Sequence, residues 1–99
     1  MLSNAQRKQL RSIGHRLNPV VMVADKGLSE GVMAELERAL TDHELIKVRL
    51  RAQKEQRTQW QAELTQATKA ELVQSIGQIS LLYRKNPKAD PNKSNLQTI

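Results

Sequence analysis

Apolar and polar residues alternate most regularly near the middle of the chain, over residues 44–51. The apolar positions are Ile46, Val48 and Leu50, and the basic positions between them are Lys47, Arg49 and Arg51. Because successive side chains of a strand point to opposite faces of a sheet, this pattern predicts a strand with one buried face and one basic face. A second apolar run, Val20–Ala24, shows no alternation and predicts a strand that is central in the sheet or covered on both sides.

Apolar residues at three- and four-residue spacing predict amphipathic helices over residues 5–15, 29–41 and 54–69. The first helix begins with a capping box, in which Ser3 and Gln6 each accept a hydrogen bond from the other's backbone N–H. The side chains expected in the core are Leu10 and Ile13 of the first helix, Leu28, Val32, Met33, Leu36, Ala39 and Leu40 of the second, and Trp60, Leu64 and Ala67 of the third.

Two further apolar runs, residues 72–76 and 79–84, flank the dipeptide Gly77-Gln78 and predict a hairpin. Glycine at the first position of a two-residue connection is what a type II′ turn requires. The order of elements is therefore helix, strand, helix, strand, helix, strand, strand. This order predicts one compact α/β domain, residues 1–85, with a mixed sheet packed with helices. Residues 86–99 are rich in Pro, Asn and Lys and predict a flexible polar tail.

The chain of 99 residues has a formal net charge of +6 and contains no cysteine. The positive charge favours polyanionic partners, and the absence of cysteine excludes disulfides and thiolate metal sites. No apolar run reaches the length that a membrane span needs, and residues 1–14 are too polar to predict a signal peptide. We therefore expect a cytoplasmic protein with no membrane partner.

Candidates for catalysis are few. The two histidines, His15 and His43, are isolated, and neither has the carboxylate partner one helical turn away that a metal site would favour. No phosphate-loop signature follows the turn before the second helix. Asp25 and Glu30 resemble an acid pair, but turn and capping roles are favoured for them. We expect no catalytic residues, no metal, no cofactor and no small-molecule substrate.

The turn Asp25-Lys26-Gly27, by contrast, has the composition of a phosphate contact. It precedes a predicted helix whose first N–H groups lack intrahelical acceptors, Lys26 can neutralise a phosphate, and Gly27 permits close approach of a backbone. The alternative is an ordinary strand-to-helix turn, in which Ser29 caps the helix and Glu30 competes with any anion.

Two more basic features favour the binding interpretation: one face of the first helix and the basic row of the alternating strand. Neither feature comes with the several aromatic residues that a base-stacking sheet needs, since the chain has one Trp, one Tyr and no Phe. Recognition should therefore rest on the nucleic-acid backbone and its shape. The candidate contact residues are Arg7, Lys8, Arg11, Asp25, Lys26, Gly27, Ser29, Lys47, Arg49 and Arg51.

Residues 2–50 contain the arrangement LxxxQRxxLRSxGHxLxPVVxVxxxGLSEGVxxELxxALxxHELIKVRL. This arrangement resembles the YhbY-type or CRM domain, an RNA-binding module of chloroplast RNA splicing and ribosome maturation proteins, and most closely its stand-alone bacterial form. The resemblance covers about residues 2–85 and is most specific at His43–Val48. It implies a four-stranded mixed sheet similar to the C-terminal domain of bacterial initiation factor three. It also implies a GxxG loop at Ala24–Gly27, where alanine stands at the first glycine position.

The resemblance further implies association with precursors of the large ribosomal subunit. We therefore expect a monomeric, non-catalytic protein that binds RNA, with ribosomal RNA as the expected target, through the Ala24–Gly27 loop and the basic surface. Two alternatives stay open: a protein-interaction module that docks on a ribosomal protein or assembly factor, and non-specific DNA binding. Salt dependence separates RNA contact from a largely apolar protein interface, because only the former weakens steeply with salt.

Overall fold

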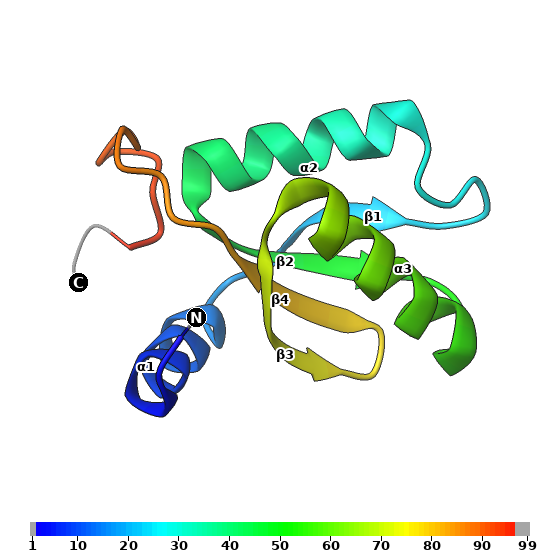
Figure 1. Ribbon diagram of the computed structural model, residues 1–99, viewed down its shortest axis with the longest axis horizontal. Helices are drawn as coiled ribbons and strands as arrows, with labels where there is room; N and C mark the ends of the chain where they lie inside the picture. Colours follow the sequence, from blue (N-terminus) through cyan, green and yellow to red (C-terminus); the bar gives the residue numbers. More distant parts are fainter. Residues whose placement is uncertain (1, 97–99) are drawn as a thin grey trace.

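The computed structural model describes residues 2–96, which form three helices and a single sheet of four strands (Figure 1). The elements are α1 (Asn4–Gly14), β1 (Pro19–Val23), α2 (Glu30–His43), β2 (Leu45–Leu50), α3 (Lys54–Thr68), β3 (Glu71–Ile76) and β4 (Ile79–Tyr83). Their order is the predicted one. The local signals are present as well: Ser3 and Gln6 form the capping box of α1, and Gly77 has the positive φ, 54°, that the predicted hairpin turn requires.

The strands form a mixed sheet in the order β1-β2-β4-β3. β1 runs parallel to β2, while β2 pairs with β4 and β4 pairs with β3 in antiparallel fashion. The crossover from β1 to its parallel neighbour β2 passes through α2, as the alternation of strand and helix predicted. The predicted fold class, an α/β domain with a four-stranded mixed sheet, is confirmed.

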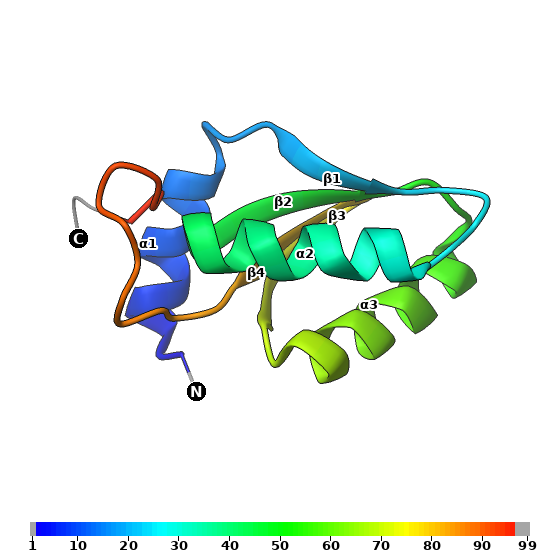
Figure 2. The same cartoon turned by 90° about the horizontal axis from the view of Figure 1, so that it is seen from above.

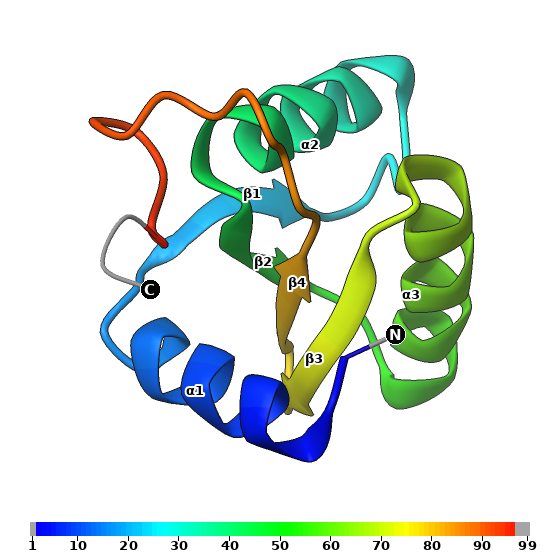
Figure 3. The same ribbon diagram turned by 60° about the vertical axis from the view of Figure 1, so that its left-hand side comes forward.

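Helices pack on both faces of the sheet (Figures 2 and 3). On one face, α2 and α3 cover the main apolar core, which includes Val23, Leu36, Leu40, Ile46, Val48, Leu50, Leu64 and Leu82. On the other face, α1 packs a smaller cluster that consists of Leu10, Leu45, Val73 and Leu81. Gly14 lets α1 approach closely, because a Cβ at this position would lie 2.6 Å from a methyl carbon of Leu81.

The second face is only partly covered, and this corrects the interpretation of the first strand. β1 is an edge strand, and its side chains Val20 and Met22 are 51% and 50% exposed, whereas Val21 and Val23 are buried. The apolar side chains of α1 pack over β2, β3 and β4, so the outward side chains of β1 have no helix above them. We call the uncovered part of this sheet face the open face.

Two further expectations differ from the structure. In α3, Ala67 is exposed and Thr68 is buried in its place, where its hydroxyl donates a hydrogen bond of 2.6 Å to the Leu64 carbonyl. Residues 86–96, the described part of the expected flexible tail, pack against the junction of α2 and β2. Ser94 donates to the Glu44 carboxylate at 2.9 Å, and the Asn95 side chain donates to the Leu45 carbonyl at 2.7 Å. Residues 97–99 lie outside the described residues.

Tyr83, at the end of β4, provides a pH-dependent prediction. Burial first, and then the carboxylates of Glu44 and Glu71, raise the pKa of its phenol above the usual value of 10.0. The folded state holds the phenolic proton more tightly than the unfolded state does. The contribution of Tyr83 to the free energy of unfolding should therefore be fully present below pH 10 and should be lost as pH rises through the titration of Tyr83. As Tyr83 is the single tyrosine, the ultraviolet absorbance of tyrosinate measures this pKa directly. A folded-state midpoint at or below that of the denatured chain would contradict the prediction.

Candidate nucleic-acid interface

The β1–α2 loop, Ala24–Gly27, is a tight turn closed by a hydrogen bond of 2.8 Å from the Gly27 N–H to the Ala24 carbonyl. Gly27 has a φ of 61°, a left-handed conformation that glycine adopts without strain. Ala24 does not have a positive φ, so the backbone requires glycine only at the second of the two GxxG positions. The turn rests on α3, since a Cβ on Gly27 would lie 3.5 Å from the indole nitrogen of Trp60.

The tip of this loop and the start of α2 face solvent. Asp25 and Lys26 are exposed. Ser29 is the N-cap of α2, as the alternative interpretation of this turn expected, and its hydroxyl oxygen accepts a hydrogen bond of 3.3 Å from the Val32 N–H. Within residues 2–96, the N–H groups of Glu30 and Gly31 have no acceptor, so they remain free for a ligand. The exposed carboxylate of Glu30 lies in the same turn and opposes a bound anion.

Two basic side chains of β2, Lys47 and Arg49, lie on the open face, and Arg51 follows directly after the strand. We call Lys47, Arg49 and Arg51 the β2 row. Lys47 borders a hollow of about 180 Å³ beside His15, at the end of α1, and Arg49 lies beside Met22 of β1. The Arg51 N–H donates a hydrogen bond of 2.8 Å to the Val23 carbonyl, which places Arg51 next to the β1–α2 loop. The structure thus brings the β2 row and the loop together.

The cations of α1 form a separate group. The helix lies at one end of the long axis and the β1–α2 loop at the other (Figures 1 and 2). Lys8 is exposed and Arg11 is half-buried. Arg7 is occupied: its guanidinium donates a hydrogen bond of 3.0 Å to the Leu72 carbonyl and lies 3.5 Å from the Glu71 carboxylate. Arg7 therefore ties α1 to β3, and the expectation of a single basic face on α1 is corrected.

This arrangement predicts different results for two neighbouring cations. Arg7→Gln should lower the free energy of unfolding by about 1 kcal/mol, because it removes a charge-assisted hydrogen bond between elements distant in sequence. Lys8→Gln removes the same charge from an exposed position and should leave stability within about 0.5 kcal/mol of wild type. Urea unfolding of both variants measures the difference, and equal stabilities would show that Arg7 is not a structural residue.

Two cations in the first turn of α3, Lys54 and Arg57, were not predicted as site residues. They lie beside the end of the β3–β4 hairpin. Lys54 and Arg57 are three residues apart in a predicted helix, a spacing that could have identified them as neighbours on its surface. The exposure of the apolar side chains of Val20 and Met22 on the open face was not predicted either, because an apolar run does not reveal whether anything covers it.

The described part of the chain offers no group of side chains suited to a metal ion. Residues 2–96 contain no cluster of three His, Asp or Glu side chains that could hold a metal ion. Among the same residues, no helix has the length and apolar character of a membrane span. What the arrangement can do is bind an anion through a basic row, a lysine at the tip of a turn and free N–H groups.

Comparison with known proteins identifies the family. The sequence profile of the CRS1/YhbY (CRM) domain matches residues 2–84, and the chain belongs to this family. It is 55% identical over 96 residues to a probable RNA-binding protein of Pseudomonas aeruginosa, a match that covers 96% of this chain and 92% of that protein. It is 46% identical over 89 residues to an RNA-binding protein of Haemophilus influenzae, with coverages of 89% and 90%.

A solved structure agrees with the same assignment. The solution structure of a hypothetical protein from Staphylococcus aureus, a candidate RNA-binding protein, superposes on this chain with a TM-score of 0.77. The two chains are 30% identical, and the match covers 91% of this chain and 95% of the other. The family resemblance drawn from the sequence is confirmed.

Proposed function

We propose that this chain is a non-catalytic RNA-binding protein that contacts RNA phosphates through the β2 row and the β1–α2 loop. The observation that carries the proposal is the position of the β2 row. Its first cation lies beside the end of α1, its second on the uncovered sheet face, and its third next to the loop. The names of the relatives from Pseudomonas aeruginosa and Haemophilus influenzae support RNA as the partner.

In this proposal the residues act by position and charge. The β2 row attracts the RNA backbone, Lys26 meets a phosphate at the tip of the loop, and the free N–H groups at the start of α2 donate to phosphate oxygens. Phosphate contacts fix the position of the RNA and carry little sequence information. With Trp60 packed against the core and beneath Gly27, the chain offers few aromatic rings for base stacking, so the shape of the RNA should decide which target is bound.

For the target we propose ribosomal RNA in a precursor of the large subunit, with this chain acting in ribosome assembly as a monomer. Support for this narrower proposal comes from the family resemblance of the sequence, which implies association with precursors of the large ribosomal subunit. Crosslinking in cells followed by sequencing of the attached RNA tests it. Enrichment of large-subunit precursor RNA is expected, and enrichment of unrelated transcripts would exclude the ribosomal role.

Lys26→Glu tests the phosphate contact at the loop. Replacing a charge-assisted contact by repulsion should weaken RNA binding by about 1–3 kcal/mol, while the exposed position should leave the fold unchanged. Lys88→Glu is the matched control, because it changes the net charge equally on the described part of the tail. Electrophoretic or fluorescence titration on a structured ribosomal RNA fragment measures both. Equal affinities of the two variants would remove the loop from the interface.

A second candidate function is docking on a protein, such as a ribosomal protein or assembly factor. The observation that favours it is the exposure of apolar side chains on the sheet: Val20 and Met22 are about half exposed, and Ile76 is 65% exposed. Met22→Ser should weaken binding to such a partner more than Lys26→Glu does, and the affinity should depend weakly on salt. For RNA, Lys26→Glu should weaken binding more than Met22→Ser, and the affinity should fall steeply with salt.

A further inference from the structure

A small polar hollow lies at the start of α3, outside the β2 row and the β1–α2 loop. It has a volume of about 200 Å³ and is lined by Lys54, Arg57, Thr58, Gln61, Ser75 and Gly77. Drug-sized ligands occupy pockets of about 300–1,000 Å³, so this hollow suits a smaller group. Because α3 forms one wall and the end of the β3–β4 hairpin forms the other, we call it the α3 hollow.

The lining of the α3 hollow is suited to an anion. It contains two cations and no carboxylate, and within residues 2–96 neither cation is paired with an acidic side chain. Arg57 is held in place by a hydrogen bond of 2.8 Å from its Nη1 to the Ala52 carbonyl, which leaves the guanidinium with further donors. Ordered guanidinium donors are well suited to phosphate oxygens.

The opposite wall contributes a hydroxyl. The Gln61 side-chain amide donates hydrogen bonds of 2.8 Å to the hydroxyl oxygens of both Ser75 and Ser80. Because Ser75 only accepts in this contact, its own proton is available to a ligand at the edge of the hollow. Thr58 differs, since its hydroxyl proton is donated to the Lys54 carbonyl at 2.9 Å.

The α3 hollow and the β1–α2 loop lie at the same end of the molecule. Trp60, one turn after Arg57, packs beneath Gly27 of the loop. The Leu50 N–H, at the end of β2, donates a hydrogen bond of 2.7 Å to the Gln78 carbonyl in the hairpin turn. A strand of RNA that leaves Lys26 and passes Arg51 would therefore meet the α3 hollow next.

We propose that the α3 hollow is a second phosphate-binding subsite for the RNA backbone, formed chiefly by Lys54 and Arg57. This inference rests on the proposed RNA-binding function. It adds two contact residues to the interface. It also gives the path of the bound RNA strand, which runs from the open face past the loop to the start of α3.

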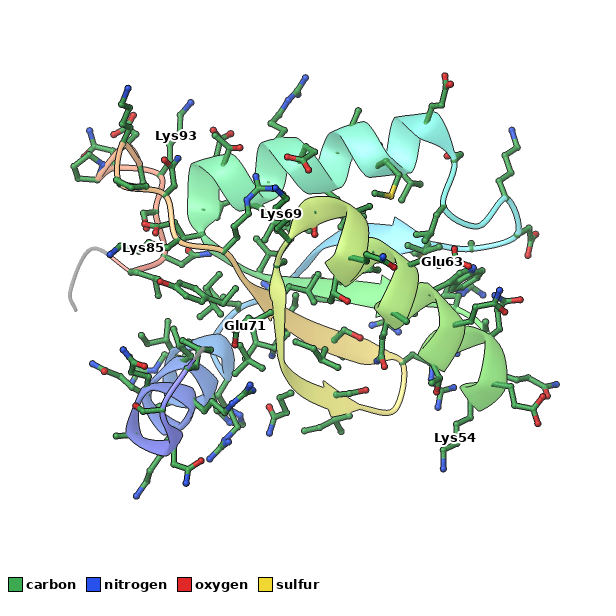
Figure 4. All side chains as sticks on the ribbon, viewed as in Figure 1. Lys54, Glu63, Lys69, Glu71, Lys85 and Lys93 are labelled. Atoms are coloured by element: carbon green, nitrogen blue, oxygen red, sulfur yellow. The ribbon has the colours of Figure 1, made fainter. Side chains whose placement is uncertain are left out.

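The test compares two double variants with equal loss of charge on one structured ribosomal RNA fragment. Lys54→Gln/Arg57→Gln removes the cations of the hollow, and Lys85→Gln/Lys93→Gln removes two lysines that lie far from it (Figure 4). The hollow variant should bind about tenfold more weakly than the control. Its slope of log affinity against log salt should be smaller by roughly 0.7 for each lost contact with a single strand.

Two additional measurements keep the test specific. Thermal unfolding of each variant detects any structural role of Arg57, and the single variant Lys54→Gln, at an exposed position, should still weaken binding about threefold. An amide NMR titration with inorganic phosphate alone gives the affinity for the free ion. Phosphate binding at the hollow without any loss of RNA affinity in the hollow variant would identify free phosphate as the ligand and overturn the inference.

The remaining outcomes separate this inference from the proposed function. Equal RNA affinity of the hollow variant and its control, with weaker binding by Lys26→Glu, would overturn the α3 subsite and leave the loop site standing. Failure of the wild-type protein to bind any RNA fragment would overturn both.

Discussion

Val48→Asp is expected to leave the domain unfolded. Val48 lies in the middle of β2 with none of its surface exposed, among the apolar side chains beneath α2 and α3. An unpaired carboxylate at this position costs several kcal/mol, a large share of the total stability of a domain this small. Circular dichroism during heating should show no cooperative transition near that of the wild-type protein.

Val20→Asp is the matched control, because it makes the same substitution in the neighbouring strand of the same sheet. Val20 is 51% exposed on the open face, so the carboxylate can remain hydrated. This variant should fold and melt within a few degrees of wild type. If both variants melted alike, the assignment of a buried and an open face to the sheet would be wrong.

The second large effect is expected from replacing the whole β2 row, Lys47, Arg49 and Arg51, with glutamine. Surface charges contribute little to stability, so the triple variant should fold. If each cation meets a phosphate, the slope of log affinity against log salt should fall by roughly 0.7–0.9 for each lost contact. At low salt the affinity should fall by a factor of about 100, since a net loss of about 1 kcal/mol for each of three exposed contacts sums to about 3 kcal/mol.

Replacing three tail lysines, Lys85, Lys88 and Lys93, with glutamine controls for net charge. These side chains are exposed on the segment that packs at the junction of α2 and β2, away from the β1–α2 loop. Their removal should change RNA affinity only slightly. Equal salt slopes for the two triple variants would mean that general charge, and not the β2 row, attracts the RNA.

Local patterns predicted the elements of this fold well, because strand alternation and helix capping depend on residues that are close together in the sequence. The alternation at 46–50 determines which side of β2 is buried, and Ser3 with Gln6 determines where α1 begins. What covers a face is decided by contacts between distant parts of the chain. Met22 therefore looked like a core residue, although α1 packs over the other three strands and leaves it exposed.

The same limit applies to the candidate site. Arg7 was grouped with its helical neighbours, but its partner is the carbonyl of Leu72, 65 residues further along the chain. Composition indicated a flexible tail, yet Ser94 and Asn95 bond to the α2–β2 junction through side chains that are common in loops. The turn at Asp25-Lys26-Gly27, in contrast, was predictable from the sequence, since Gly27 satisfies a local backbone requirement.

The central claim is that RNA lies against the β1–α2 loop and the β2 row. Ultraviolet crosslinking in cells, followed by mass spectrometry of the RNA-linked peptides, tests it most directly. The crosslinked residues should fall in 24–29 and 47–51, with residues 54–57 added if the α3 hollow binds the same strand. Crosslinks confined to the exposed acidic side chains of α2, such as Glu35 and Glu37, or to α1 alone, would contradict the account.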